Sequence, residues 1–484
     1  MVGIGARLNK IFQKQSITTG MFGVLYGSCL TVAPMVLVIG VLLLLEYLLG
    51  FDSLDYYTRE LFSCTILYIF IFSLLTASPF NSVLSKYMQD AIFEERYQDI
   101  LPCYYFGLVL NLTLTCLLGI PFCLWEHFMG GVPVAYVFTG FCGYISLTLV
   151  FYSMLYLSIC KDYGRISLFF LVGMLISFIL ALVLYFLAGW ETTRAMLLAM
   201  TVGFFLIAVL EYGSVRRYFV ENSSRFLPVL KYFGRYWHLV AINFLYTLGL
   251  YIHNFVFWTT DMRMVVANSF VCNQPYDMAS CLAMFTNISA TVIFIARVEM
   301  YFHERYKAYS EAVIGRKLAD IQSTKRKMFR EIANQLLDLA RLQFIISVVV
   351  YLLFVVILPR FGFAGLTMRI YPCLAAGYFI LFQMYAEILF LYYFKDMWGA
   401  VFTAAGFCLV TFLGSLIAAH LPDIWFGIGV VAGAFAGWCV GYMRLRWVER
   451  HMEYQTFCQG QLIAWGRGVR PSNLVYTREA ETQA

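Results

Sequence analysis

Long apolar runs separated by short polar segments fill most of the sequence. A helix needs about 20 apolar residues to cross the roughly 30 Å hydrocarbon layer of a membrane. The chain offers twelve candidate spans, the ninth of them short: residues 22–49, 58–80, 103–125, 134–159, 166–189, 195–214, 238–259, 279–297, 343–359, 370–394, 399–420 and 424–443. The pattern predicts an all-α polytopic membrane protein with about 12 transmembrane helices.

Lysine and arginine are concentrated in alternate connections between these runs. Cytoplasmic loops of membrane proteins are enriched in both residues. If the N-terminus is cytoplasmic, only five of the 34 basic residues lie outside, and the other 29 lie inside. We therefore expect a multi-pass protein of the cytoplasmic (inner) membrane with both termini in the cytoplasm. The first apolar run is too long for a cleavable signal peptide and is expected to remain as the first helix.

Two long basic segments divide the chain into two sets of six spans. Pro34 interrupts the first helix of one set and Gly249 the first helix of the other, which predicts a bent helix at the start of each. Two six-helix bundles around a central cleft form an architecture typical of transporters. The expected parts are a cytoplasmic N-terminal segment (1–21), a first six-helix bundle (22–214), a basic cytoplasmic connection (215–237), a second six-helix bundle (238–443) with a cytoplasmic amphipathic helix near 300–342, and a cytoplasmic tail (444–484).

The amphipathic helix carries an apolar stripe and a group of basic residues. The stripe recurs at helical spacing through Leu318, Ile321, Met328, Ile332, Leu336 and Leu339. The basic residues are Arg316, Lys317, Lys325, Arg326, Lys327 and Arg330. Such a helix lies on anionic membrane lipid, where each basic residue contributes about 1 kcal/mol to the free energy of membrane binding, or it docks a cytoplasmic partner. The two interpretations are compatible.

Composition agrees with a membrane protein. Hydrophobic residues make up 61% of the chain, charged residues 13%, and the mean hydropathy is +0.75. The net charge of +6 follows from the basic cytoplasmic loops and does not indicate a nucleic-acid partner. Most of the 13 cysteines fall inside spans as small apolar side chains. Only Cys272 and Cys281 flank an outside loop closely enough to be tested as a pair.

The sequence contains no motif for catalysis or for a bound cofactor. It lacks a phosphate-binding Walker loop, a cysteine and histidine metal cluster and a nucleophile elbow. A membrane glycosyltransferase would need acidic groups at a water-facing site, and the longest outside loop offers only Asp261 and Asp277, which more often cap helices or hydrate an interface. We therefore predict no enzyme activity, no metal and no cofactor.

Polar side chains inside spans are the candidates for a substrate pathway, because unpaired polar groups are costly in hydrocarbon. Glu387 and Gln383 lie one helical turn apart, so they share a face and could bind a sugar hydroxyl or carry a coupling proton. The alternative is a helix-packing contact. The other candidates are Asn243, Tyr246, His253 and Asn254 in the seventh span, Asn111 in the third and Asn287 in the eighth.

Four stretches of the sequence resemble one known family. They are Gly3–Gly5 with Leu8 and Lys10, SVLSKYMQDAIFEERYQDIL at 82–101, YFGRYWHLVAINFLYTLGLYIHNFVFW at 232–258, and YDMASCLAMF through ARVEMYFHERY at 276–306. The chain resembles the Pel exopolysaccharide transporters of the PelG family over roughly residues 3–450. The resemblance implies membership of the multidrug, oligosaccharidyl-lipid and polysaccharide flippase superfamily, with two six-helix bundles.

The resemblance also implies a substrate and partners. The substrate would be the Pel exopolysaccharide of biofilms, a polymer rich in amino sugars. The partners would be a cytosolic PelF-like glycosyltransferase, a PelD-like cyclic-di-GMP receptor and a PelE-like membrane protein. Three functions remain open: export of the polymer, flipping of a lipid-linked oligosaccharide, and a non-transporting scaffold of the synthase complex.

Overall fold

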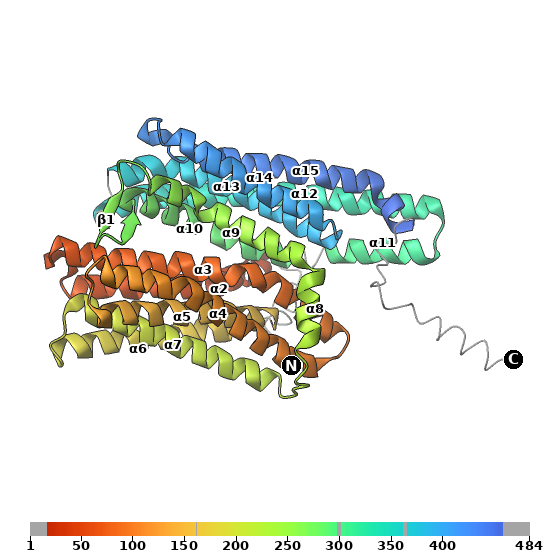
Figure 1. The fold of residues 1–484 in the computed structure, drawn as a ribbon. Coiled ribbons are helices and arrows are strands. Elements are labelled where there is room, and N and C mark those ends of the chain that lie inside the picture. The colour runs from red at the N-terminus through yellow and green to blue at the C-terminus, as the bar shows by residue number, and fades with distance from the viewer. Residues whose placement is uncertain (1–16, 161, 298–301, 362–364, 458–484) are drawn as a thin grey trace.

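The computed structural model describes residues 17–160, 162–297, 302–361 and 365–457. The chain forms two halves that lie side by side with their helices roughly parallel, joined by a short helix (Figure 1). The first half contains α2 (Ile17–Leu48), α3 (Tyr56–Phe93), α4 (Ile100–Phe128), α5 (Val134–Ile159), α6 (Tyr163–Phe186) and α7 (Thr192–Tyr218). The joining helix is α8 (Leu227–Arg235).

The second half also has six long helices, together with a β-hairpin and one shorter helix. Its elements are α9 (Trp237–Phe257), β1 (Met264–Val266), β2 (Phe270–Cys272), α10 (Gln274–Arg297), α11 (His303–Gly315), α12 (Leu318–Ile357), α13 (Leu366–Tyr393), α14 (Met397–Ala418) and α15 (Ile428–Phe457). We call the end of the molecule with β1 and β2 the hairpin end, and the opposite end the α8 end (Figure 1).

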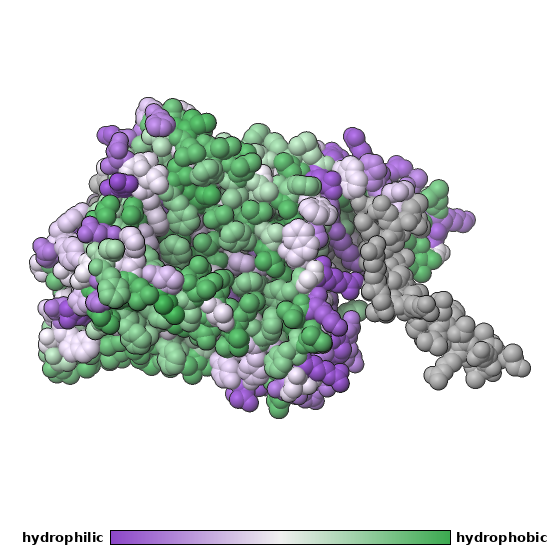
Figure 2. Space-filling model, in the orientation of Figure 1, coloured by the Kyte–Doolittle hydropathy of each residue, from purple (hydrophilic) through white to green (hydrophobic). Residues whose placement is uncertain are grey.

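The predicted fold class is confirmed. Ten helices among the described residues are long and apolar enough to cross a membrane. With α2 and α10, which run alongside these ten, each half has six long helices. Hydrophobic residues cover the middle of the surface and hydrophilic residues gather towards both ends, as expected for a protein surrounded by lipid (Figure 2).

Polar residues in the connections start several of these helices. Asp55 begins α3 by accepting a hydrogen bond from the backbone N–H of Tyr57 at 3.2 Å, and Asp396 begins α14 in the same way through Gly399 at 3.1 Å. A side-chain acceptor at this position satisfies a backbone donor that has no partner within the helix. The short polar segments of the sequence therefore set where the membrane helices begin.

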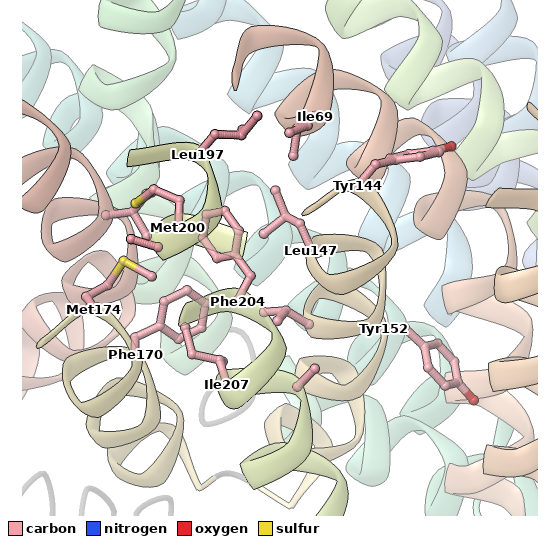
Figure 3. Close-up of a cluster of buried hydrophobic side chains, with 14 of the residues drawn as sticks. Ile69, Tyr144, Leu147, Tyr152, Phe170, Met174, Leu197, Met200, Phe204 and Ile207 are labelled. Atoms are coloured by element: carbon pink, nitrogen blue, oxygen red, sulfur yellow. The ribbon is translucent and has the colours of Figure 1, made fainter. Parts of the chain in front are cut away.

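The core of each half consists of apolar side chains from its own helices. In the first half, Leu147 of α5, Met174 of α6 and Phe204 of α7 meet in one such cluster (Figure 3). In the second half, α15 approaches α14 and α13 through a row of glycines at four-residue spacing: Gly429, Gly433, Gly437 and Gly441. Small residues at this spacing allow helix backbones to approach closely within a membrane.

The bends expected at Pro34 and Gly249 stay predictions, because both residues lie within continuous helices. Pro34 does lie inside α2. Gly249 lies inside α9, where a Cβ atom would come within 2.7 Å of the Phe407 ring on α14. Gly249 is therefore a position of close helix packing.

The predicted amphipathic helix is the N-terminal part of α12. At 1.5 Å per residue its 40 residues span about 60 Å, and with α11 it extends past the other helices at the α8 end (Figure 1). Ile321, Met328, Ile332 and Leu339 of the apolar stripe are buried, whereas Leu318 is exposed. Phe329 stacks on Phe394 at 5.3 Å. The buried residues of the stripe thus pack against the second half itself and not against lipid headgroups.

Candidate functional site

The two halves meet along α3 and α9, and at the hairpin end the contact is extensive. The Tyr68 hydroxyl of α3 donates to the backbone oxygen of Val271 at 2.8 Å and accepts from its N–H at 3.0 Å. The Tyr68 ring stacks on Trp258 at 5.1 Å and meets the edge of Phe270 at 4.9 Å. The hairpin of the second half is therefore docked on the first half.

Polar contacts also join the halves further along α3. Asn243, one of the predicted pathway residues, donates from α9 to the Ser78 backbone oxygen at 3.1 Å and to the Ser82 hydroxyl at 2.5 Å. At the α8 end, the Tyr232 hydroxyl donates to Asp90. Lys86 lies over the Tyr236 ring at 5.2 Å. The junction thus contains polar groups along its length.

A buried polar network lies in the second half beside this junction, and its centre is Asp277 of α10. The Asp277 carboxylate accepts hydrogen bonds from Asn254 Nδ2 at 2.7 Å, from Trp258 Nε1 at 2.9 Å and from the backbone N–H of Asn273 at 3.0 Å. Asp277 is only 6% exposed. Three donors on one buried carboxylate offset much of the free energy needed to remove it from water.

The network continues from Asn254 to His253. The Ser280 hydroxyl donates to Asn254 Oδ1 at 3.5 Å and lies 3.2 Å from the Tyr378 hydroxyl of α13. Tyr378 lies 3.3 Å from His253 Nε2, and the Tyr276 hydroxyl lies 3.0 Å from His253 Nδ1. His253 is fully buried. The seventh predicted span therefore contributes two adjacent residues to a network that ties α9, α10 and α13 together.

Glu387 and Gln383 lie apart from this network, further along α13. Both are buried, at 1% and 9% exposure. Glu387 packs against Gly441 of α15, and its Oε2 has no hydrogen-bond partner among the described residues, nor has Gln383 Nε2. A buried carboxyl group with a free acceptor is a costly arrangement in a membrane, so Glu387 stays a strong functional candidate.

The remaining predicted pathway residues are dispersed. Tyr246 lies in an aromatic contact with Tyr385 at 5.1 Å. Asn111 is buried in the first half, where its Nδ2 donates to the Gly107 backbone oxygen of its own helix at 2.8 Å. The side chain of Asn287 lies outside the described residues. The structure thus brings His253 and Asn254 together, places Asn243 at the junction and leaves Asn111 apart.

Comparisons with known proteins agree with this architecture. The family model of PelG, described as an exopolysaccharide exporter (EPS-E), matches residues 1–457. The chain belongs to the PelG exopolysaccharide exporter family. A comparison with curated proteins gives no match.

Solved structures similar to this PelG-family chain are multidrug transporters of the MATE family and a relative. A MATE protein in the straight conformation superposes with a TM-score of 0.58 at 12% identity, covering 88% of this chain and 96% of that one. An outward-facing MATE transporter of the MOP superfamily gives 0.57 at 13% identity, covering 87% and 95%. A MOP superfamily transporter from Pyrococcus furiosus gives 0.54 at 15% identity, covering 88% and 96%. These similarities establish a shared transporter fold.

Sequence reasoning missed several functional candidates of the PelG-family chain. The sequence places Asp277 only in an outside loop; in the structure it accepts a backbone hydrogen bond at the start of α10 and also accepts hydrogen bonds from Asn254 and Trp258. The sequence contains a signal for this role, because Asp277 lies in the first turn of the helix that follows the polar span. Glu211 of α7 is fully buried, and neither of its carboxylate oxygens has a hydrogen-bond partner among the described residues. Its position inside an apolar run could have identified it.

The first half also contains an aromatic cavity near the hairpin end. Its volume is about 250 Å³, and side chains of α3, α4 and α5 line it. Phe270 of the hairpin forms part of its wall, and Glu126 contributes a carboxyl group that is 4% exposed. The Glu126 Oε1 atom has no hydrogen-bond partner in the described part of the chain.

The predicted docking residues lie on the extension formed by α11 and α12. Arg316, Lys317, Arg326, Lys327 and Arg330 are exposed. Lys325 differs, because its Nζ atom forms an ion pair with Glu453 of α15 at 3.3 Å and its side chain is only 14% exposed. Five of the six basic residues are therefore free to meet a partner, while Lys325 holds α12 against α15. In the residues that the structure describes, no group of histidine, cysteine or carboxylate side chains could hold a metal ion.

Proposed function

We propose that this protein exports the Pel exopolysaccharide, an amino-sugar-rich polymer, across the cytoplasmic membrane. The observation that carries the proposal is the match of the exopolysaccharide exporter family over residues 1–457, together with a transporter fold. The polymer would pass between the two halves. The polar groups of the junction, Asn243 with Ser78 and Ser82, support a route that hydrated sugar rings can follow.

The basic residues support an orientation for this export. Placing them inside puts the α8 end, with the extension of α11 and α12, in the cytoplasm and the hairpin end outside. The polymer would then enter at the α8 end and leave at the hairpin end. Rocking of one half against the other is the usual way in which two such bundles expose a route alternately to each side.

Reconstitution tests the proposal. The protein is placed in vesicles with its synthase and a labelled sugar nucleotide, and polymer on the far side of the membrane is measured with and without an imposed ion gradient. Export predicts protected polymer only when the protein is present. A flippase predicts transfer of a lipid-linked oligosaccharide, and a scaffold predicts that synthesis depends on the protein but protected polymer does not form.

Glu387→Gln tests whether a proton couples to export. Glutamine keeps the size of the side chain but cannot release a proton, so we expect the export rate to fall about tenfold and to lose its dependence on pH. Initial rates of export by the vesicles at several pH values measure this. Glu221→Gln, an exposed residue of the connection, is the control. A Glu387→Gln variant that exports at the wild-type rate at every pH contradicts the coupling role.

We infer that the extension of α11 and α12 binds the cytosolic part of the synthase complex. The family suggests a PelF-like glycosyltransferase, a PelD-like cyclic-di-GMP receptor and a PelE-like membrane protein as partners. The exposed residues Arg326, Lys327 and Arg330 present positive charge beyond the membrane helices. An acidic partner surface complements this charge and speeds association.

Charge reversal at Arg326, Lys327 and Arg330 is expected to reduce the glycosyltransferase that co-purifies by at least tenfold. Lys325 is left unchanged, because its ion pair with Glu453 belongs to the fold. Reversal of the exposed Arg263 and Arg369, which lie towards the other side of the membrane, is the control and is expected to leave the complex intact. If the glycosyltransferase still co-purifies at the wild-type level after charge reversal at the three α12 positions, the proposed docking role of these residues is contradicted.

A further inference from the structure

Two cysteines from different halves meet at the hairpin end. The Sγ atoms of Cys64 on α3 and Cys272 on β2 lie 3.0 Å apart, although 208 positions separate them in the sequence. Each residue is 2% exposed. The sequence suggested Cys281 as the neighbour of Cys272, but Cys281 is exposed and Cys272 faces Cys64 instead.

The contacts on both sides of the pair fix its position. Tyr68, one helical turn beyond Cys64, forms two hydrogen bonds with the backbone of Val271. On the other side of Cys64, the Tyr56 hydroxyl donates to the Met264 sulfur at 2.8 Å, and Met264 is the pairing partner of Cys272 in the hairpin. The two thiols are therefore held together by a docked interface, not by a chance approach of flexible loops.

We propose that Cys64 and Cys272 form a disulfide that cross-links the two halves at the hairpin end. The proposal rests on the orientation proposed above, which puts this end in the oxidising compartment outside the cytoplasmic membrane, where disulfides form and persist. The oxidant is a disulfide-containing molecule of that compartment that oxidises thiols. One cysteine thiolate attacks the oxidant's disulfide to give a mixed disulfide, and the second cysteine displaces the oxidant. Two protein thiols are oxidised and the oxidant leaves as two thiols.

The cross-link has a conformational consequence. The disulfide ties α3 of the first half to the hairpin. The hairpin is itself held to α10, because the Asp277 carboxylate accepts a hydrogen bond from the backbone N–H of Asn273, the residue after Cys272. With the bond formed, the halves cannot separate at this end. Export that requires such separation therefore takes place only after a dithiol reductant of the same compartment has reduced the bond, which returns the two cysteines to thiols and converts the reductant to its disulfide.

Dissolving native membranes directly in denaturant that contains N-ethylmaleimide, followed by peptide mass spectrometry, tests the bond, because every free thiol is then accessible to the reagent. We expect eleven of the 13 cysteines to react with N-ethylmaleimide before reduction, and Cys64 and Cys272 to react only after it. Cys64→Ala is expected to make Cys272 reactive without reduction. Cys103→Ala, at an equally buried position where the thiol lies 3.5 Å from the Tyr156 hydroxyl, is the control and leaves both residues protected. Full reaction of Cys64 and Cys272 before reduction overturns the proposal.

A second measurement tests the consequence. Oxidised wild-type protein in vesicles is expected to export at least tenfold less polymer than the same protein after reduction, whereas Cys64→Ala exports equally under both conditions. Equal export by oxidised and reduced wild-type protein overturns the block on separation. The alkylation result does not require export, so a disulfide found in a protein that exports nothing under any condition contradicts the proposed function and not the bond.

Discussion

Asp277→Ala is expected to abolish most export and to lower the thermal stability of the protein. The substitution removes the acceptor for Asn254 Nδ2, Trp258 Nε1 and the Asn273 backbone N–H, all in a buried position. A buried donor left without an acceptor costs about 1–3 kcal/mol. For a unit of the size of one half, each kcal/mol lowers the unfolding midpoint by about 2–4 °C, so one donor left without an acceptor lowers it by about 2–12 °C, and the loss of all three acceptor contacts is expected to lower it by at least about 5 °C.

Two variants separate this effect from the loss of any aspartate near the hairpin. Asp277→Asn keeps the size of the side chain and one acceptor oxygen, so its unfolding midpoint is expected to lie between those of the wild type and Asp277→Ala. Asp261→Ala removes an exposed carboxylate from the same connection and is expected to change neither stability nor export. Thermal unfolding in detergent measures the stability of each variant, and export by vesicles measures its activity. If Asp277→Ala behaves like Asp261→Ala, the network is not needed for the fold or for export.

Gly433→Val is expected to give the second large effect, a loss of folded protein. A Cβ atom at Gly433 would come within 2.7 Å of the Thr411 backbone nitrogen and 2.9 Å of the Phe407 backbone oxygen on α14. Neither backbone atom can turn aside as a flexible side chain can, so α15 must move away from α14. Overpacking of this kind costs about 1–3 kcal/mol, and separation of the two helices exposes further contacts.

The matched control for this variant is Gly213→Val in α7. A Cβ atom at Gly213 meets no atom within 4 Å, so valine there is expected to leave the folded yield and the unfolding midpoint close to those of the wild type. Size-exclusion chromatography and thermal unfolding measure both variants. Equal behaviour of Gly433→Val and Gly213→Val would show that the close approach of α14 and α15 contributes little to stability.

The candidate site could be predicted only in part from the sequence. His253 and Asn254 stand out because polar residues are rare within spans, and the structure joins both to one network. Their partners Asp277, Ser280 and Tyr378 come from two other helices. No local pattern reveals which faces of α9, α10 and α13 pack together, so the sequence does not identify Asp277 as the centre of the network.

The membrane helices and their division into two sets of six follow from the order of residues along the chain. Hydrocarbon thickness fixes the length of an apolar run, and the cost of charge within lipid confines lysine and arginine to the loops, so both can be counted along the chain. Which distant residues meet depends on how the helices pack in three dimensions. Cys64 faces Cys272 and Gly249 packs against Phe407 because whole helices dock in one register, and that register depends on side-chain shapes from both partners at once.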